Sequence, residues 1–336
     1  MTTPRVSVLI PTYRYARYLA EAVDSILAQD FGDFELIISD DCSGDGSWEI
    51  METYAARDPR IRIHIHAANI GMVQNWNWCL SQARGDFVKY VFGDDRLARP
   101  DALISMVALL VMNPDATLAA SARELMDEHS KPVGRTDTFG ARGLHGAAGT
   151  MLRCLAEGNI IGEPTSVMFR RASAARGFSL AYEQLVDLEM WLHLLEHGAI
   201  MYTAEPLCAF RKHPLQQTEA NRKKLTDKNE YLRLVLDYGR SPLLGARDVR
   251  KIEFHRLYES RKFLHDKAVA AVRPQLMRRF GRSAYCARWL LRKLANPFAA
   301  LAKWAGLKKK RGALTRRRAR GTVRAMRAAM DDEQTP

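Results

Sequence analysis

The stretch FVKYVFGDD, residues 87–95, joins an apolar run to two adjacent carboxylates, Asp94 and Asp95. The apolar run predicts a buried strand, which places both carboxylates just beyond the carboxyl end of that strand. Adjacent carboxylates repel each other and resist ionising together unless a cation lies between them. The stretch therefore predicts a ligand site that holds a divalent cation, or a cation together with a phosphate group.

Three further apolar runs precede this stretch, at residues 6–10, 34–39 and 61–65. The segments between the runs place apolar residues at helical spacing: Leu19, Val23, Ile26 and Leu27, and later Val73, Trp76, Leu80 and Ala83. Strands that alternate with helices are typical of a parallel sheet. The predicted fold class is therefore α/β, with a central, mostly parallel sheet flanked by helices.

Polar side chains follow all four runs, where a parallel sheet binds its ligands, in the crevice beyond the carboxyl ends of its strands. The residues are Pro11-Thr12-Tyr13, Asp40 to Ser47, Asn69-Ile70-Gly71 and Asp94-Asp95. Taken alone, residues 40–47 also fit a turn and a helix N-cap, and the acid pair fits a loop before a helix opened by Pro100. At the ends of neighbouring strands, the four groups together predict one acidic cleft.

Size and composition place the chain among globular proteins with one large domain and a smaller appendage, since it has 336 residues of which 47% are hydrophobic. The five cysteines are scattered without a CxxC spacing, which argues against a disulfide framework or a zinc knuckle. We expect them to be buried thiols. No signal sequence precedes Val6 and no apolar stretch reaches the roughly 20 residues of a membrane span, so we expect a cytoplasmic protein.

The formal net charge of +13 is concentrated at the end of the chain. Residues 1–240 contain 26 Lys and Arg against 31 Asp and Glu, whereas residues 241–336 contain 25 against 7. Tryptophan and leucine alternate with cations over residues 289–307 and a polybasic run follows, which is typical of a helix in a membrane interface. We expect the tail to attach the protein peripherally to the anionic inner face of the cytoplasmic membrane.

Two other interpretations of the tail remain. A run of cations is often a solvated, disordered extension. Basic runs also neutralise nucleic-acid phosphates, although the tryptophans here are spaced as an apolar face rather than as a platform for stacked bases. We therefore expect no nucleic-acid partner.

Five segments stand out in order along the chain: VSVLIPTYRYARYLAEAVDSILAQ, FELIISDDCSGDGS, NIGMVQNWNWCLSQARGDFVKYVFGDD, LVDLEMWLHLLEHG and FRKHPLQQT. Together they resemble family 2 of the glycosyltransferases, which are inverting, sugar-nucleotide-dependent enzymes of the GT-A fold. The resemblance covers about residues 5–218 and implies a Rossmann-like GT-A domain over residues 1–220. Beyond it, helical spacing at residues 229–238 and 249–272 predicts an appended helical region at residues 221–285, and we expect a basic amphipathic tail at residues 286–336.

The resemblance implies a site for the nucleotide of the donor. In the family, the loop after the first strand holds the base, which assigns this role to Pro11, Thr12 and Tyr13, with Tyr13 able to stack on the base. It assigns to Asp41 the acceptance of a hydrogen bond from the ring N–H, which implies uracil or thymine. A UDP- or dTDP-sugar is therefore the expected donor.

The resemblance also assigns roles to the acid pair. Asp94 is placed nearer the ribose, and Asp95 is expected to hold Mg²⁺ or Mn²⁺ against the diphosphate, where the metal neutralises the departing nucleotide. His213 corresponds to a histidine of a loop that closes over the diphosphate or touches the metal, so it is the second metal candidate. Alone, it would also fit an ordinary surface histidine.

An inverting transfer needs a base that takes the proton from the attacking acceptor hydroxyl. In the family this base is a carboxylate at the start of a helix, in a pattern that Val186-Asp187-Leu188-Glu189-Met190-Trp191 matches in part. Asp187 is the predicted catalytic base, with Glu189 as its competitor and Glu183 as a more distant alternative. A first-turn carboxylate that only complements the helix dipole is the structural interpretation.

Three positions depart from the family pattern. Phe92 stands where many relatives carry a further acid, Arg14 where asparagine is common, and Cys42 in place of a glycine. We predict sugar transfer to a glycan or polyprenyl-linked acceptor in cell-surface polysaccharide synthesis. Phe92 keeps open an alternative, a catalytically silent sugar-nucleotide-binding or scaffold protein at the membrane. The absence of GxGxxG after the first strand argues against a nicotinamide dehydrogenase.

Overall fold

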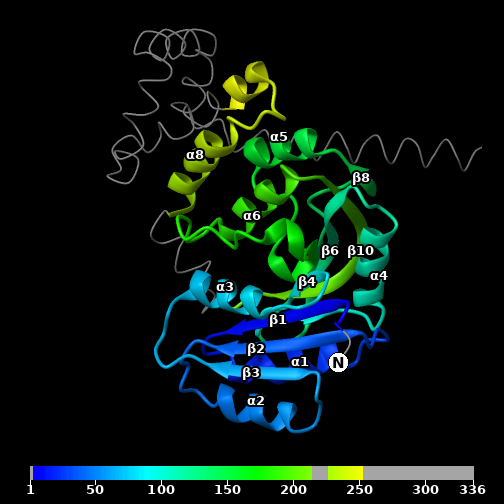
Figure 1. The fold of residues 1–336 in the computed structure, drawn as a ribbon, viewed down its shortest axis with the longest axis vertical. Helices are drawn as coiled ribbons and strands as arrows, with labels where there is room; N and C mark the ends of the chain where they lie inside the picture. The colour runs from blue at the N-terminus through cyan, green and yellow to red at the C-terminus, as the bar shows by residue number, and fades with distance from the viewer. Residues whose placement is uncertain (1–2, 214–225, 253–336) are drawn as a thin grey trace, which may run out of the picture. The chain divides into compact units, whose positions relative to one another are not determined.

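Strands form at each of the four apolar runs of the sequence (Figure 1). The structure, a computed structural model, describes residues 3–213 and 226–252. β1 (Val6–Thr12), β2 (Phe34–Asp40), β3 (Ile61–Ile65) and β4 (Phe87–Tyr90) pair in parallel in the order β3-β2-β1-β4. Every residue of β1 and β2 is buried, because helices cover both faces of this part of the sheet. The predicted parallel sheet is confirmed here.

Beyond β4 the sheet becomes mixed. β9 (Val167–Arg170) pairs antiparallel with β4 and with β6 (Ala116–Met126), and β10 (Ala199–Arg211) runs parallel to β6. The described residues form one sheet in the order β3-β2-β1-β4-β9-β6-β10-β5. This order places the end of β4, and with it the acid pair, in the middle of the sheet. Three short strands complete it by antiparallel pairing: β5 (Arg96–Leu97), β7 (Pro132–Thr136) and β8 (Gly143–His145).

Helices pack on the two faces of the sheet and divide the core into two layers. Side chains alternate along β1, so that Val8 and Ile10 enter one layer and Leu9 enters the other. The first layer contains α1 (Ala16–Leu27), α2 (Ser47–Ala55) and α4 (Ala102–Val111). The second contains α3 (Met72–Gln82), α5 (Ala147–Glu157) and α6 (Val186–Leu195). Two short 3₁₀-helices, η1 (Pro164–Ser166) and η2 (Arg171–Ala174), flank β9.

A further helix, α8 (Thr226–Tyr238), belongs to the second layer. It confirms the helical spacing of residues 229–238 and lies beside α5 and α6 (Figure 1). Leu234, Val235 and Tyr238 are buried in the same core as Trp191 of α6. All described residues belong to one compact unit, so α8 is packed into the α/β body rather than set apart from it.

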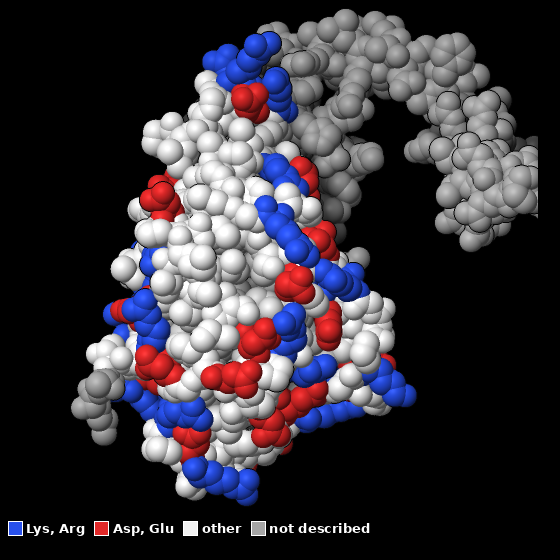
Figure 2. Space-filling view, turned by 90° about the vertical axis from the view of Figure 1, so that its right-hand side faces the viewer, with Lys and Arg blue, Asp and Glu red and all other residues white. Residues whose placement is uncertain are grey.

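The surface of the described part carries mixed charge. Figure 2 shows Lys and Arg interspersed with Asp and Glu on one face, in keeping with the small net charge of residues 1–240. No helix in the described ranges has the length and apolar character that crossing a membrane requires. The expected basic tail at residues 286–336, most of the helix expected at residues 249–272, and Cys286 lie outside the described residues.

The expectation of buried thiols is correct for three cysteines and wrong for one. Cys79, Cys154 and Cys208 are buried, whereas Cys42 is exposed. Cys42 lies in the turn after β2 with φ of 61°, so the chain turns at this residue and its side chain faces solvent.

Candidate active site at the carboxyl ends of the strands

The residues predicted to hold the nucleotide lie together because β1 pairs with both β2 and β4. The backbone N–H of Asp41 donates to the carbonyl of Thr12 at 3.0 Å, which ties the two strand ends to each other. Thr12 is buried, and its hydroxyl has no hydrogen-bond partner among the described residues. A Cβ at Gly93 would lie 2.9 Å from this hydroxyl, so only glycine fits where β4 passes β1. The hydroxyl of Thr12 is therefore a buried group with unused hydrogen-bonding capacity.

Asp41 is fixed by the chain that follows β3. Its Oδ1 accepts the backbone N–H of Ile70 at 2.7 Å, and its Oδ2 accepts that of Gly71 at 3.0 Å. Only 2% of Asp41 is exposed. A carboxylate has about four lone-pair positions, so both oxygens retain the capacity to accept a hydrogen bond from a base. The neighbouring Tyr13 is 39% exposed, as a side chain that stacks on a bound base must be.

Asp40, the other acid of that pair, has a structural function. It accepts the backbone N–H of Ser43 at 3.0 Å and its hydroxyl, and the Ser43 hydroxyl accepts the backbone N–H of Arg14 at 2.8 Å. Arg14 and Cys42 both have φ near +60°. Asparagine and glycine, the residues that the family resemblance led us to expect at these two positions, adopt this conformation most easily. The two departures thus keep the loop conformation with less favourable residue types.

The acid pair is buried, with exposed fractions of 5% for Asp94 and 1% for Asp95. Oδ2 of Asp95 accepts the hydroxyl of Thr165 at 2.6 Å, and Oδ1 accepts the backbone N–H of Arg211 at 2.9 Å. Burial, with the neighbouring charge of Asp94, raises the pKa of Asp95 well above its usual range. A bound cation is the ordinary way to keep such a carboxylate ionised.

His213 lies against Asp94, with Nε2 of the imidazole 3.0 Å from Oδ2 of the carboxylate. Only 7% of His213 is exposed, and its ring packs against the rings of Tyr15 and Tyr18. Burial, with the charges of the acid pair, raises the pKa of the Tyr15 hydroxyl far above its usual range. The predicted residues Asp94, Asp95 and His213 are therefore brought together.

This donor set fits a divalent cation whose shell is only partly supplied by protein. Carboxylate oxygen and imidazole nitrogen are ligands of Mn²⁺, and Mg²⁺ is usually held by one or two carboxylates with substrate phosphates and water. Within residues 3–213 and 226–252 no group of three or more His, Cys, Asp or Glu side chains is arranged to hold a metal ion. A cation here would thus need further ligands from a bound diphosphate or water.

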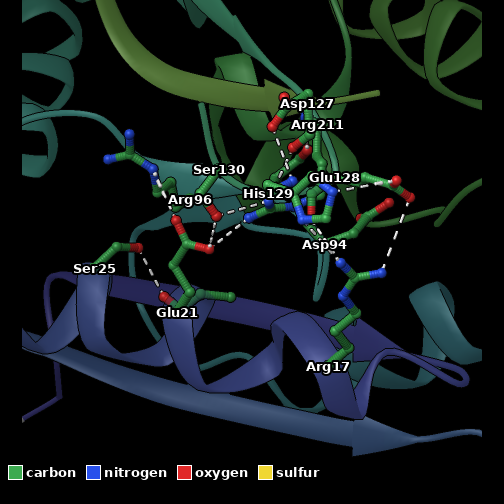
Figure 3. Close-up of polar contacts among 12 residues, drawn as sticks. Arg17, Glu21, Ser25, Asp94, Arg96, Asp127, Glu128, His129, Ser130 and Arg211 are labelled. Carbon is green, nitrogen blue, oxygen red and sulfur yellow. Dashed lines mark hydrogen bonds and ion pairs between the residues drawn. The ribbon is translucent and has the colours of Figure 1, made fainter. Parts of the chain in front are cut away.

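Arg211 is a buried cation that sequence reasoning missed. Its Nε donates to the carbonyl of Asp94 at 2.7 Å, and its guanidinium contacts Glu21 of α1 at 2.6 Å and Ser130 at 2.9 Å. Figure 3 shows it between α1 and the turn that links β6 to β7. The guanidinium also lies over the ring of Tyr18, 4.4 Å from its centre. Arg211 therefore fixes the backbone of the acid pair at Asp94.

Lys89 is a second buried cation, and its position within an apolar strand was the signal that could have revealed it. It is 1% exposed, and its Nζ donates to the carbonyls of Thr165 and Val167. Burial lowers the pKa of its amine to about 8. Because Thr165 also bonds Asp95, Lys89 positions η1 beneath the acid pair. Phe92, in the place of the further acid, packs instead on Trp76 with ring centres 4.8 Å apart.

Asp187 lies in the first turn of α6. Its Oδ1 accepts the backbone N–H of Leu188 at 2.7 Å, and its Oδ2 accepts Nδ2 of Asn159 at 2.8 Å. Burial, assisted by the nearby carboxylate of Glu163, raises the pKa of Asp187 to about 7. A carboxylate with this pKa is suited to accept a proton near neutral pH.

The two alternatives to Asp187 differ from it in their surroundings. Glu189 is buried, binds the guanidinium of Arg176 at 2.8 and 2.9 Å, and accepts the hydroxyl of Tyr238 at 2.6 Å. Its carboxylate therefore joins the loop after η2 to α6 and α8. Glu183 is exposed in the loop before α6. These contacts favour Asp187 over both.

The acid pair and Asp187 are not hydrogen-bonded to each other directly. Segment 159–167 connects them. At one end Asn159 bonds Asp187, and at the other Thr165 bonds Asp95. Between them the carbonyl of Gly162 accepts the indole N–H of Trp191 at 2.9 Å. Nucleotide residues, metal candidates and the candidate base thus line one edge of the sheet and its adjoining helix.

Comparison with protein families finds a match over residues 7–178 to the family described as Glycosyl transferase family 2. The matched segment begins in β1, contains the acid pair, and ends before α6. Asp187 and His213 lie beyond it.

Two curated proteins of Bacillus subtilis (strain 168) are similar in sequence. "Putative glycosyltransferase EpsE" is 32% identical over 205 residues, which are 58% of this chain and 68% of EpsE. "Putative teichuronic acid biosynthesis glycosyltransferase TuaG" is 29% identical over 199 residues, which are 59% of this chain and 75% of TuaG.

Among solved structures, that of S. aureus TarS 1–349 in complex with UDP-GlcNAc is similar, with a TM-score of 0.60. The two chains are 18% identical, and the likeness covers 82% of this chain and 80% of the TarS chain. At this identity the likeness shows the fold, so the expected GT-A fold is confirmed.

Proposed function

The chain belongs to glycosyl transferase family 2, and on that premise we propose that it is an inverting enzyme that moves a sugar from a UDP- or dTDP-sugar to a glycan or lipid-linked acceptor of cell-surface polysaccharide synthesis. The observation that carries the proposal is the set of polar groups gathered at the carboxyl ends of the parallel strands. The ends of β1 and β2 supply nucleotide-binding groups, the chain after β4 supplies the acid pair, and α6 supplies a separate carboxylate with a pKa of about 7. The name of TuaG supports the polysaccharide product, and the UDP-GlcNAc of TarS supports a nucleotide-sugar donor.

The donor nucleotide binds at the ends of β1 and β2. The unpartnered hydroxyl of Thr12 and the carboxylate of Asp41 meet the nucleoside from the buried side, and Tyr13 covers the base from the exposed side. Pro11 fixes the backbone of β1 at this point. An acceptor carboxylate opposite a ring N–H selects uracil or thymine over cytosine, which has no ring N–H at that position.

Asp95 and His213 would hold Mg²⁺ or Mn²⁺ beside the diphosphate, with Asp94 nearer the ribose. The cation supplies neutralisation of the charge that develops on the departing nucleoside diphosphate. The chain contributes the orientation of these ligands. Arg211 fixes the backbone of Asp94, and Thr165 fixes the carboxylate of Asp95.

Asp187 takes the proton from the acceptor hydroxyl as that oxygen attacks the anomeric carbon from the side opposite the leaving group. One displacement inverts the configuration at that carbon. With a pKa of about 7, the base is half ionised near neutral pH and strong enough to take the proton as the new bond forms.

Calorimetric titration with UDP, dTDP, GDP and CDP tests the donor site, first with Mn²⁺ and then with EDTA. We expect UDP or dTDP to bind in Mn²⁺, and Asp95→Ala to weaken that binding at least tenfold. Asp187→Asn is the matched control, because it removes a carboxylate outside the nucleotide site and should leave the affinity unchanged. Absence of binding by all four nucleotides would contradict the proposal.

A further inference from the structure

Asn159, which lies between α5 and η1, makes a defined contact with the candidate base. Its Nδ2 donates to Oδ2 of Asp187 at 2.8 Å and to the carbonyl of Gly162 at 3.2 Å. Its Oδ1 accepts the backbone N–H of Gly162 at 3.0 Å. Because that N–H can bond only to an acceptor, the amide cannot flip, and its nitrogen must face the carboxylate.

Helix α8 holds the backbone of Asn159. The hydroxyl of Tyr231 accepts the backbone N–H of Asn159 at 3.2 Å. The preceding residue, Gly158, has φ of 110°, and a Cβ there would lie 2.9 Å from the same hydroxyl. The chain thus comes close to Tyr231 only because glycine stands at this position.

The residue before Tyr231 holds the loop that leads to Asp187. The carboxylate of Glu230, 7% exposed, accepts three consecutive backbone N–H groups at the entrance of α6, those of residues 183, 184 and 185, at 2.6, 2.9 and 2.7 Å. This loop leads directly into the first turn of α6, where Asp187 lies. Two adjacent residues of α8 therefore fix the two segments that carry Asn159 and Asp187.

We propose that Asn159 is a positioning residue for the catalytic base. Glu230 and Tyr231 of α8 hold the amide of Asn159 and the carboxylate of Asp187 at hydrogen-bonding distance from each other. The inference rests on the proposed role of Asp187. It makes α8, which lies beyond the segment matched to the family, a part of the acceptor side of the active site. Loss of α8 contacts would then impair proton transfer while nucleotide binding stays intact.

The physical basis is the preference of an amide N–H for the ionised carboxylate. The hydrogen bond from Asn159 favours the charged form and so opposes the effect of burial, which favours the neutral form. A hydrogen bond to a charged group is strong enough to change a pKa by about one to two units. Removing it should raise the pKa of Asp187 and release the carboxylate from its fixed orientation.

The test is the pH dependence of donor hydrolysis by the full chain, in which water replaces the acceptor. The probe is whichever of UDP-Glc, UDP-Gal, UDP-GlcNAc and dTDP-Glc the wild type hydrolyses fastest. For Asn159→Ala we expect the acidic limb of kcat to move up by about one pH unit and kcat at pH 7 to fall about tenfold. Asn159→Asp, which has the same shape, should move the limb further, because a second carboxylate then faces Asp187.

The matched control is Asn77→Ala. Asn77 also binds one backbone segment with both ends of its amide, at Phe178, with distances of 2.7 and 2.9 Å, but it makes no hydrogen bond to Asp187. Its loss should lower the melting temperature without moving the acidic limb. Nucleotide affinity, measured by calorimetry, should be the same in all these variants.

The result that would overturn the inference is an acidic limb of Asn159→Ala and Asn159→Asp that coincides with that of the wild type. Failure of the proposed function looks different, since Asp187→Asn would then hydrolyse the donor as fast as the wild type. If Asn159→Ala does not fold, Asn159→Asp decides the question alone.

Discussion

At the scale of single residues, the candidate active site contains carboxylates that are buried away from water. Asp95 and Asp187 both have a raised pKa, and burial is the main cause in each case. Their partners differ in kind. Asp95 lies beside another carboxylate and would be kept ionised by a cation, whereas Asp187 is held by one amide. This difference matches their proposed roles, in which Asp95 binds a cation and Asp187 takes a proton.

Asp187 should destabilise the folded chain at neutral and alkaline pH. Its pKa is about 7 when folded and about 4 when unfolded, so the folded state holds this proton more tightly. The cost of ionising it is absent below pH of about 4, grows as the pH rises, and is complete above pH of about 7. We expect Asp187→Asn to raise the free energy of unfolding at pH 8 by about 2 to 4 kcal/mol, with no gain at pH 4.

Urea unfolding at several pH values measures this gain. Glu52→Gln, which removes an exposed carboxylate on α2, is the control and should change the stability little at any pH. An equal effect of Asp187→Asn at pH 4 and pH 8 would show that the raised pKa is not the cause.

The site residues that could be predicted from the sequence are those that directly follow the strands. Asp41 and Asp94 stand directly after apolar runs, so the geometry of a parallel sheet brings them to one edge. Arg211 and Lys89 were not recognised, because their hydrogen-bond partners are distant in sequence and come close only in the folded chain. Glu21 is 190 residues from Arg211, and Thr165 is 76 residues from Lys89. Only the lone lysine within an apolar strand hinted at a buried contact.

At the scale of elements, β10 ends where the acid pair, α1 and the turn between β6 and β7 meet. Arg211, its last residue, joins all three (Figure 3). Because the guanidinium of Arg211 is itself buried, it depends on these partners to compensate for its lost hydration.

Arg211→Met should therefore destabilise the chain by about 3 to 5 kcal/mol, since it removes a buried cation that donates to the Glu21 carboxylate and to the carbonyls of Asp94 and Asp127. Arg17→Met is a matched control in the same network, because Arg17 is exposed and lies 3.9 Å from Glu128. It should cost less than about 1 kcal/mol. Chemical denaturation of both variants measures the difference. Equal losses would mean that Arg211 is not the central contact.

The elements themselves were largely predictable. The four apolar runs became β1 to β4, and helical spacing located α1, α3 and α8. The antiparallel insertion of β9 between β4 and β6 was not foreseen, since pairing between distant strands leaves no local pattern in sequence. That insertion matters for the site, because β9 follows η1 and thus sets the segment that joins Asp95 to Asp187.

At the scale of the whole molecule, the two layers of the core divide the chemistry between them. The parallel half of the sheet holds the residues proposed to bind the nucleotide, and the layer of α5, α6 and α8 holds the candidate base. Segment 159–167 crosses from one to the other.

The stereochemistry of donor hydrolysis tests the central claim, inverting transfer with Asp187 as the base, most directly. Proton NMR of a UDP-α-sugar with wild type and with Asp187→Asn shows which anomer of the free sugar appears first, before mutarotation. The proposal predicts that the β-anomer appears first with the wild type, and that Asp187→Asn releases sugar at least a hundredfold more slowly. Initial release of the α-anomer, or equal rates for the two proteins, would contradict it.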